Sequence, residues 1–188
     1  MNITPKRILS RGFTLIELLI VVIILAILAA IVIPQFANTT NDAREGALDS
    51  NLSTLRSAVE LYKIQHKNVY PGTAPTGAAS PACTGTAGAT TAGPQAMIDQ
   101  LTKASDANGN TCDVASASFG FGPYFRGTIP AEPITNKGTL PADIAVTTTG
   151  AALAPTAATG GWAFDSKSGQ IVMNSNALDI KGKPFSTH

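Results

Sequence analysis

The 188-residue chain has few of the residue types that most enzymes and nucleic-acid-binding proteins need. Charged residues make up 13% of it and the formal net charge is +1, so no strong field for a nucleic acid is present. No glycine-rich phosphate loop follows a predicted strand, and Gly-x-Ser-x-Gly is absent. The two histidines, His66 and His188, are expected to be solvated. The sequence therefore predicts a structural protein, with no catalytic residues and no cofactor.

Cysteine is equally scarce, with Cys83 and Cys112 the two present. They lack a Cys-x-x-Cys spacing and a nearby histidine, so a zinc site is not indicated. An even pair fits one disulfide in an oxidising compartment. We therefore predict a Cys83–Cys112 bridge, which would stabilise the fold by about 3 kcal/mol.

Aliphatic side chains, by contrast, are concentrated in one place. Residues 18–33 are sixteen consecutive apolar residues, and the stretch from Phe13 to Phe36 contains one charge, Glu17. At about 1.5 Å per helical residue, this stretch can cross a bilayer core of roughly 30 Å. The residues before it carry three positive charges, which places the leader in the cytoplasm and the rest of the chain outside. Those charges are on Lys6, Arg7 and Arg11.

An ordinary secretory signal peptide or a plain membrane anchor would explain part of this pattern. Signal peptides carry an apolar stretch of about 7–15 residues and end at small residues, whereas this run is longer and ends in Pro34-Gln35-Phe36. A plain anchor has no reason to hold a carboxylate one turn into its apolar segment, because an unpaired charge in lipid is costly. Glu17 is therefore a candidate functional residue.

The segment from Arg11 to Glu17, Arg-Gly-Phe-Thr-Leu-Ile-Glu, followed by an all-apolar helix, resembles the class III signal of type IV pilins and type II secretion pseudopilins. In that family a membrane-embedded aspartyl peptidase cuts after the glycine and methylates the new N-terminal amine. The resemblance implies cleavage between Gly12 and Phe13 and methylation of Phe13. It also assigns the family's glutamate to Glu17 and its helix-kinking proline to Pro34.

The resemblance further implies how such a subunit is stored and assembled. The precursor would cross the inner membrane once, with its N-terminus in the cytoplasm, and then enter a periplasmic or cell-surface helical filament of identical subunits. Its partners would be the prepilin peptidase and an inner-membrane assembly platform, with no nucleic acid predicted. In the filament, Glu17 of one subunit can neutralise the ammonium on Phe13 of its neighbour, which removes most of the cost of burying each charge. Pairing within one chain is the alternative.

Beyond residue 37 the helical pattern becomes amphipathic and ends near Asn68, because Tyr70-Pro71-Gly72 stops it. Apolar residues recur at spacings of four, three, four and three, which indicates a helix packing on its own domain. These residues are Leu48, Leu52, Leu55, Val59 and Tyr62. The predicted divisions are a cleaved leader (1–12), a transmembrane and assembly helix (13–36), an amphipathic spine (37–68) and a loop-rich head (69–188).

The head is rich in Gly, Pro, Thr and Ala, which favours short elements and turns. We predict a short helix over 94–103 and a hairpin over 161–173, where Trp162 and Phe164 alternate on one strand and Ile171 and Met173 on the other. The fold class is therefore α+β, a long N-terminal helix packed against a small antiparallel sheet. Segment 129–136, with its Ile-Pro, Pro and Asn, resembles part of type II secretion pseudopilins.

Four residues of the last third could offer oxygen ligands to a cation, namely Asp165, Asn174, Asn176 and Asp179. Asn and Asp in turns more often cap the backbone, so no metal is predicted. A major type II secretion pseudopilin and a major type IV pilin both fit the sequence. The alternative is a minor or tip pilin that binds a surface, a secreted substrate or DNA.

Overall fold

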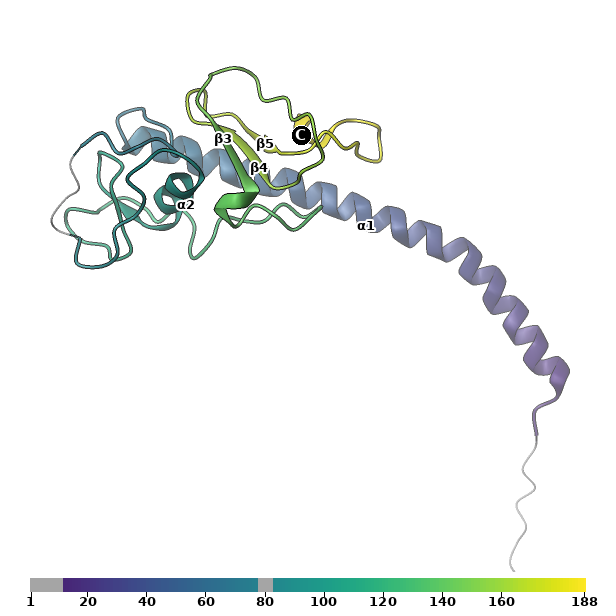
Figure 1. Cartoon of the computed structure of the whole chain (residues 1–188). Helices are drawn as coiled ribbons and strands as arrows, with labels where there is room; N and C mark the ends of the chain where they lie inside the picture. The colour runs from purple at the N-terminus through teal and green to yellow at the C-terminus, as the bar shows by residue number, and fades with distance from the viewer. Residues whose placement is uncertain (1–11, 78–82) are drawn as a thin grey trace, which may run out of the picture. The chain divides into compact units, whose positions relative to one another are not determined.

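The computed structural model describes residues 12–77 and 83–188 (Figure 1). The predicted leader therefore lies outside the described residues except for Gly12. The chain divides into two compact units, the first ending at Asn41 and the second running from Asp42 to His188. The helix α1, Leu15–Gln65, contributes residues to both units.

In the first unit, the α1 segment Leu15–Ile33 consists of Ile, Leu, Val and Ala apart from Glu17, and none of the residues whose burial is described in this unit is buried. Every residue from 12 to 33 is exposed. The helix continues through Pro34 without interruption, and a bend at that residue remains a prediction.

In the second unit, one face of α1 forms the centre of the core. The five residues of the predicted stripe, Leu48 to Tyr62, are all fully buried, as expected for a helix that packs on its own domain. The helix ends at Gln65, slightly before the predicted end near Asn68. Lys67 and Asn68 adopt positive φ angles of 56° and 63°, and the Asn68 N–H donates to the Lys63 carbonyl at 3.0 Å. This turn satisfies one of the carbonyls left free at the helix end.

The predicted short helix is present as α2, Pro94–Thr102. Met97 and Leu101 are buried in the same core as the α1 stripe, and Ile98 packs at its edge. Beside α2, the two-residue strands β1 (Ala104–Ser105) and β2 (Thr111–Cys112) pair antiparallel. The Cys83–Cys112 disulfide is present, with a Cα–Cα distance of 5.6 Å.

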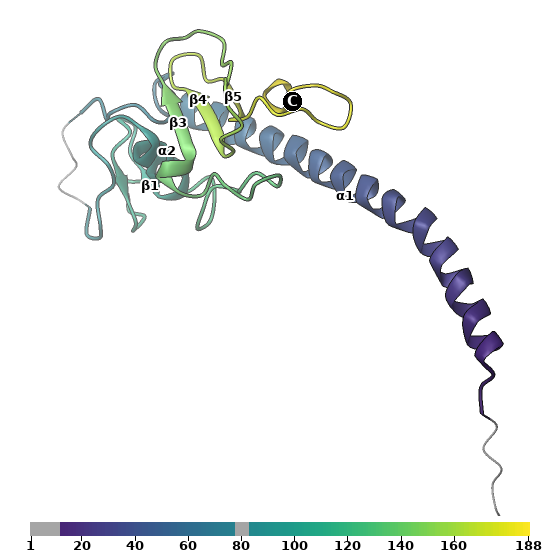
Figure 2. The ribbon, with the colours of Figure 1, turned by 45° about the vertical axis from the view of Figure 1, so that its right-hand side comes forward.

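Three strands lie over the second unit's part of α1 in both views (Figures 1 and 2). They are β3 (Ile144–Thr147), β4 (Trp162–Asp165) and β5 (Ile171–Met173). The predicted hairpin is confirmed, because β4 and β5 pair antiparallel with Trp162 opposite Met173. In contrast, β3 and β4 are parallel, so the sheet is mixed. Residues 148–161 supply the long connection that a parallel pair needs. The 3₁₀ turns η1 (Pro141–Asp143) and η2 (Phe185–Thr187) complete the unit.

The expectation that both histidines are solvated was wrong. His66 is 2% exposed and its ring stacks on that of Tyr62, with ring centroids 3.7 Å apart. His66 follows Tyr62 by four residues, so it extends the buried stripe by one more position. His188 is only partly exposed, and its Nδ1 lies 2.8 Å from Oδ1 of Asp49.

Candidate processing and assembly site

The predicted cleavage position lies just before α1. Gly12 and Phe13 are exposed and are not part of the helix. A methyl group added to Gly12 would meet no atom within 4 Å beyond Gly12 itself and its two neighbours in the chain, so the space beside this residue is open. The bond between Gly12 and Phe13 is therefore accessible from outside the chain.

Thr14 and Glu17 form a reciprocal cap at the start of α1. The Glu17 Oε2 atom accepts hydrogen bonds from the backbone N–H of Thr14 at 2.9 Å and from its hydroxyl at 2.8 Å. In return, the Glu17 N–H donates to the Thr14 Oγ1 atom at 3.2 Å. The arrangement is a capping box, which satisfies N–H groups that a helix start leaves without partners. Sequence reasoning missed it, although Thr-x-x-Glu at positions 14–17 is its signature.

The cap gives the Glu17 carboxylate a partner within its own chain. Thr14 directly follows Phe13, so the amine that cleavage would create lies one residue from the groups that Glu17 already binds. The structure thus brings the carboxylate to the end of the helix where a new positive charge would appear. The roles of Gly12, Phe13 and Glu17 in processing and assembly remain predictions.

The helix that follows carries a continuous apolar surface. Among the described residues, the segment Leu15–Ile33 is long and apolar enough to cross a membrane. None of its side chains is covered within its own unit. An exposed apolar surface of this extent indicates contact with lipid or with other protein chains.

Two of the four candidate oxygen ligands, Asp165 and Asp179, accept backbone N–H groups in turns. The buried Asp165 carboxylate accepts backbone N–H groups from Ser168 at 2.7 Å and from Gly150 at 3.0 Å. Burial alone would raise the pKa of Asp165, but these N–H groups, with the Thr147 hydroxyl, hold that pKa far below its ordinary value. Among the described residues, no group of three or more His, Cys, Asp or Glu could hold a metal ion.

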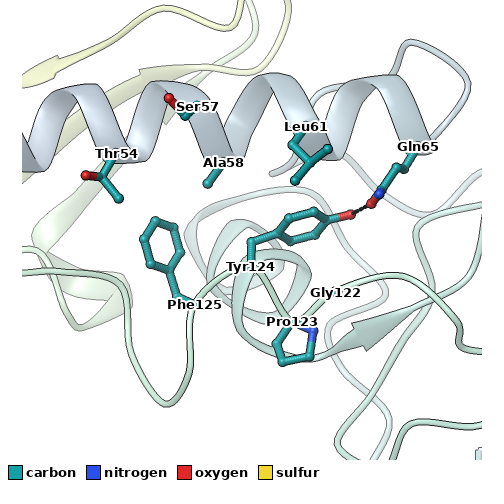
Figure 3. Close-up of a pocket in the computed structure, with 9 residues that line it drawn as sticks. All are labelled: Thr54, Ser57, Ala58, Leu61, Gln65, Gly122, Pro123, Tyr124 and Phe125. Carbon is teal, nitrogen blue, oxygen red and sulfur yellow. Dashed lines mark hydrogen bonds between the residues drawn. The ribbon is translucent and has the colours of Figure 1, made fainter.

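The second unit also contains a groove beside α1 (Figure 3). It encloses about 440 Å³ and lies between one face of α1 and the segment Gly122–Phe125. The Tyr124 hydroxyl donates to Oε1 of Gln65, and burial raises the pKa of Tyr124 to about 12. The remaining lining is small or apolar and uncharged. The Thr54 and Ser57 hydroxyls donate to the helix carbonyls of Ser50 and Ser53 at 2.9 Å, and no histidine, cysteine or carboxylate is among the lining residues.

Comparison with known proteins finds similarity in the N-terminal part of the chain. Residues 8–33 match the family model for the prokaryotic N-terminal methylation motif. The type IV narrow pilus major component PilA5 of Thermus thermophilus is 40% identical over 60 residues, which are 32% of this chain and 52% of that protein. The type II secretion system core protein G of Pectobacterium carotovorum is 38% identical over 64 residues, 34% of this chain and 40% of that protein.

The type IV major pilin protein PilE1 of Neisseria gonorrhoeae is 40% identical over 74 residues, covering 39% of this chain and 34% of that protein. The chain thus spans about half the length of these relatives, or less. No solved structure matches it. The predicted resemblance to type IV pilins and type II secretion pseudopilins is confirmed, by the motif over residues 8–33 and by relatives that match about a third of the chain.

Proposed function

We propose that this chain is a structural subunit of a filament of the type IV pilus or type II secretion kind, assembled from a membrane-stored precursor cleaved between Gly12 and Phe13. One observation carries the proposal. A single helix begins with a methylation motif, continues as a fully exposed apolar segment and then changes to a half whose apolar stripe is fully buried.

The division of labour along α1 supports assembly through its first half. The second unit has its own core, built from the α1 stripe, α2 and the sheet, and does not need residues 13–36 to bury it. The exposed segment is therefore available to other chains. Once the segments leave the membrane, packing them against one another keeps their apolar side chains out of water, where exposure would cost free energy roughly in proportion to the area exposed.

Before assembly, the same segment would anchor the precursor in the inner membrane with its leader in the cytoplasm. The peptidase would act on the exposed Gly12–Phe13 bond and methylate Phe13. An assembly platform in that membrane would then transfer the subunit to a periplasmic or cell-surface filament. The charged amine of Phe13 and the Glu17 carboxylate of a neighbour would pair in the filament core.

We further propose that the chain is a major subunit of the filament and not a subunit at its tip. The relatives named above are called a major component, a core protein and a major pilin, and each is similar to this chain over about a third of its length or slightly more. Type IV pili and type II secretion systems both use this segment, so the proposal is made for the filament that they have in common.

A strain lacking the gene tests the proposal. Restoring the wild-type chain should return extracellular or periplasmic filaments, in which this chain is the most abundant protein of the sheared fraction. Restoring Gly12→Leu should leave uncut precursor in the membrane and no filaments. Unchanged filaments in the deletion strain would contradict the proposal, and a few copies per filament would indicate a tip subunit instead.

A further inference from the structure

The loop after β5 contains a tight, well-bonded turn, residues 178–184, which we name the Asp179 turn. The Asp179 carboxylate accepts the backbone N–H groups of Lys181 at 2.8 Å and Lys183 at 2.7 Å. The Asp179 N–H donates to the Lys183 carbonyl at 2.7 Å, and Leu178 and Pro184 form an isolated antiparallel bridge. These bonds hold the turn in one conformation.

In the Asp179 turn the large aliphatic and positively charged side chains are exposed, whereas the one acidic side chain is buried. Leu178 is 61% exposed and Ile180 is 49% exposed, although both are large aliphatic residues. Lys181 and Lys183 are also exposed, whereas Asp179 is buried. The outer surface of the turn therefore presents two aliphatic side chains and two cations, with no carboxylate of its own.

The turn is fixed to the part of α1 at which the second unit begins. The Ile180 N–H donates to Oε1 of Glu45 at 3.0 Å, and Glu45 lies three residues after Asp42. The next acid along the helix, Asp49, is bound by His188. Both views show the loop after β5, in yellow, extending beside α1 (Figures 1 and 2). Along the chain, Glu45 lies twelve positions after Ile33, the last residue of the apolar segment.

We infer that the Asp179 turn is a docking surface for an anionic phospholipid bilayer. Leu178 and Ile180 enter the headgroup region of the bilayer. The ammonium groups of Lys181 and Lys183 bind the acidic headgroups, while the aliphatic parts of these two side chains lie deeper, toward the acyl chains. The inference rests on the proposed membrane storage, because the apolar segment of α1 keeps the turn close to the bilayer at high effective concentration.

Docking would give the second unit a defined tilt before assembly. Twelve helical residues rise about 18 Å, which is the greatest height at which a helix could hold Glu45 above the end of the apolar segment. The turn would leave the lipid when the subunit enters the filament. Each lysine near an anionic surface shifts such an equilibrium by roughly fivefold, so the pair makes docking depend on anionic lipid.

A matched pair of labelled variants tests this inference in the full-length chain. Leu178→Cys and Leu140→Cys each receive the same fluorophore, since Leu140 is also 61% exposed but lies next to η1, outside the turn. The labelled chains are reconstituted into phosphatidylcholine vesicles with or without phosphatidylglycerol, plus a lipid carrying a nitroxide in its headgroup. Mass analysis confirms one label per chain and an intact Cys83–Cys112 bridge.

The nitroxide should quench the label at position 178 several times more than the label at position 140, and only when phosphatidylglycerol is present. Adding Lys181→Glu and Lys183→Glu, or raising the salt concentration, should bring position 178 to the level of position 140. If the chain stays in the vesicles after alkaline carbonate treatment but both positions are quenched equally, the docking surface is overturned and membrane storage is not. Protection of position 178 that depends on protein density instead of lipid assigns the turn to contacts between subunits. Release of the chain by alkaline carbonate overturns membrane storage as well.

Discussion

Thr14 and Glu17 bind each other in both directions at the start of α1, through three hydrogen bonds of 2.8 to 3.2 Å. The carboxylate that the filament account pairs with a neighbouring amine is therefore a helix cap in the uncut chain. The two roles need different properties of the side chain. A cap needs a hydrogen-bond acceptor, whereas the amine needs a negative charge.

Substitutions at Glu17 and Thr14 separate these roles. Glu17→Gln keeps an acceptor that suits a capping box but removes the charge. Thr14→Ala weakens the cap, at a cost of about 1 kcal/mol, and keeps the charge. We expect Glu17→Gln and Glu17→Val to be cut normally yet to remain in the membrane, because an unpaired buried amine costs about 3–5 kcal/mol. Thr14→Ala should still form filaments.

Immunoblots of cell and sheared fractions, with N-terminal mass analysis, distinguish the outcomes. Uncut Glu17 variants would mean that the carboxylate serves peptidase recognition. Wild-type filament yield from a correctly cut Glu17→Val chain would refute pairing between subunits.

Removing the exposed half of α1 should leave a soluble monomer. A chain of residues 38–188 retains the buried Leu48–Tyr62 stripe and the core that packs on it. It lacks the apolar segment that we propose drives assembly. Sedimentation velocity should give one monomeric species, and stable oligomers would show instead that the second unit contains the assembly surface.

His66 should make the stability of this monomer depend on pH. Its Nδ1 lies 2.8 Å from the Tyr62 carbonyl, which can only accept, so neutral His66 donates from Nδ1 and accepts from the Ser105 hydroxyl at Nε2. Burial lowers the pKa of His66 below its ordinary 6.5. The unfolded chain therefore binds a proton at this histidine more readily than the folded chain does. The free energy of unfolding that comes from keeping His66 neutral is complete above pH 6.5 and declines as pH falls from 6.5 toward the lowered pKa.

Urea unfolding followed by Trp162 fluorescence can measure this dependence between about pH 7.5 and 5. His66→Gln is the matched variant, because it keeps a donor and an acceptor but does not titrate in this range. His188 is present in both proteins, so the difference in slope reports His66. Identical slopes would mean that protonated His66 is as stable in the core as in the unfolded chain.

The Cys83–Cys112 bridge should stabilise the second unit by about 3 to 4 kcal/mol, as expected for a sequence separation of 29 residues. Non-reducing peptide mapping should find the two cysteines joined in the mature protein. The Cys83→Ser, Cys112→Ala chain should unfold at lower urea concentration, and reducing agent should affect the wild type alone. Two free thiols in mature protein would contradict the prediction.

Elements of the fold that are encoded by patterns repeated over many residues could be predicted from the sequence. The α1 stripe has five members with helical spacing, and the hairpin has alternating large side chains around Asp-Ser-Lys-Ser-Gly, so each pattern indicates one structure. Both are present with the expected residues buried. The capping box was also readable, as Thr-x-x-Glu directly before the apolar run.

Contacts between distant segments could not be predicted in this way. Glu132 is fully buried and accepts the backbone N–H groups of Ile134 at 2.7 Å and Gly161 at 3.4 Å, and nothing local to Glu132 indicates the second partner. The parallel pairing of β3 with β4 depends on the path of residues 148–161, whose Thr, Ala and Gly residues fit many conformations. The burial of His66 also required Ser105, 39 residues away.

Cleavage of the precursor after Gly12 can be read from the N-terminus of the native subunit. Intact-mass and N-terminal peptide analysis of protein from sheared filaments should show a chain that begins at Phe13 with a methylated amine. The twelve removed residues carry three of the thirteen basic side chains, so the mature chain should also have a net charge of −2 where the precursor has +1. A native filament subunit that still begins at Met1 would contradict the account.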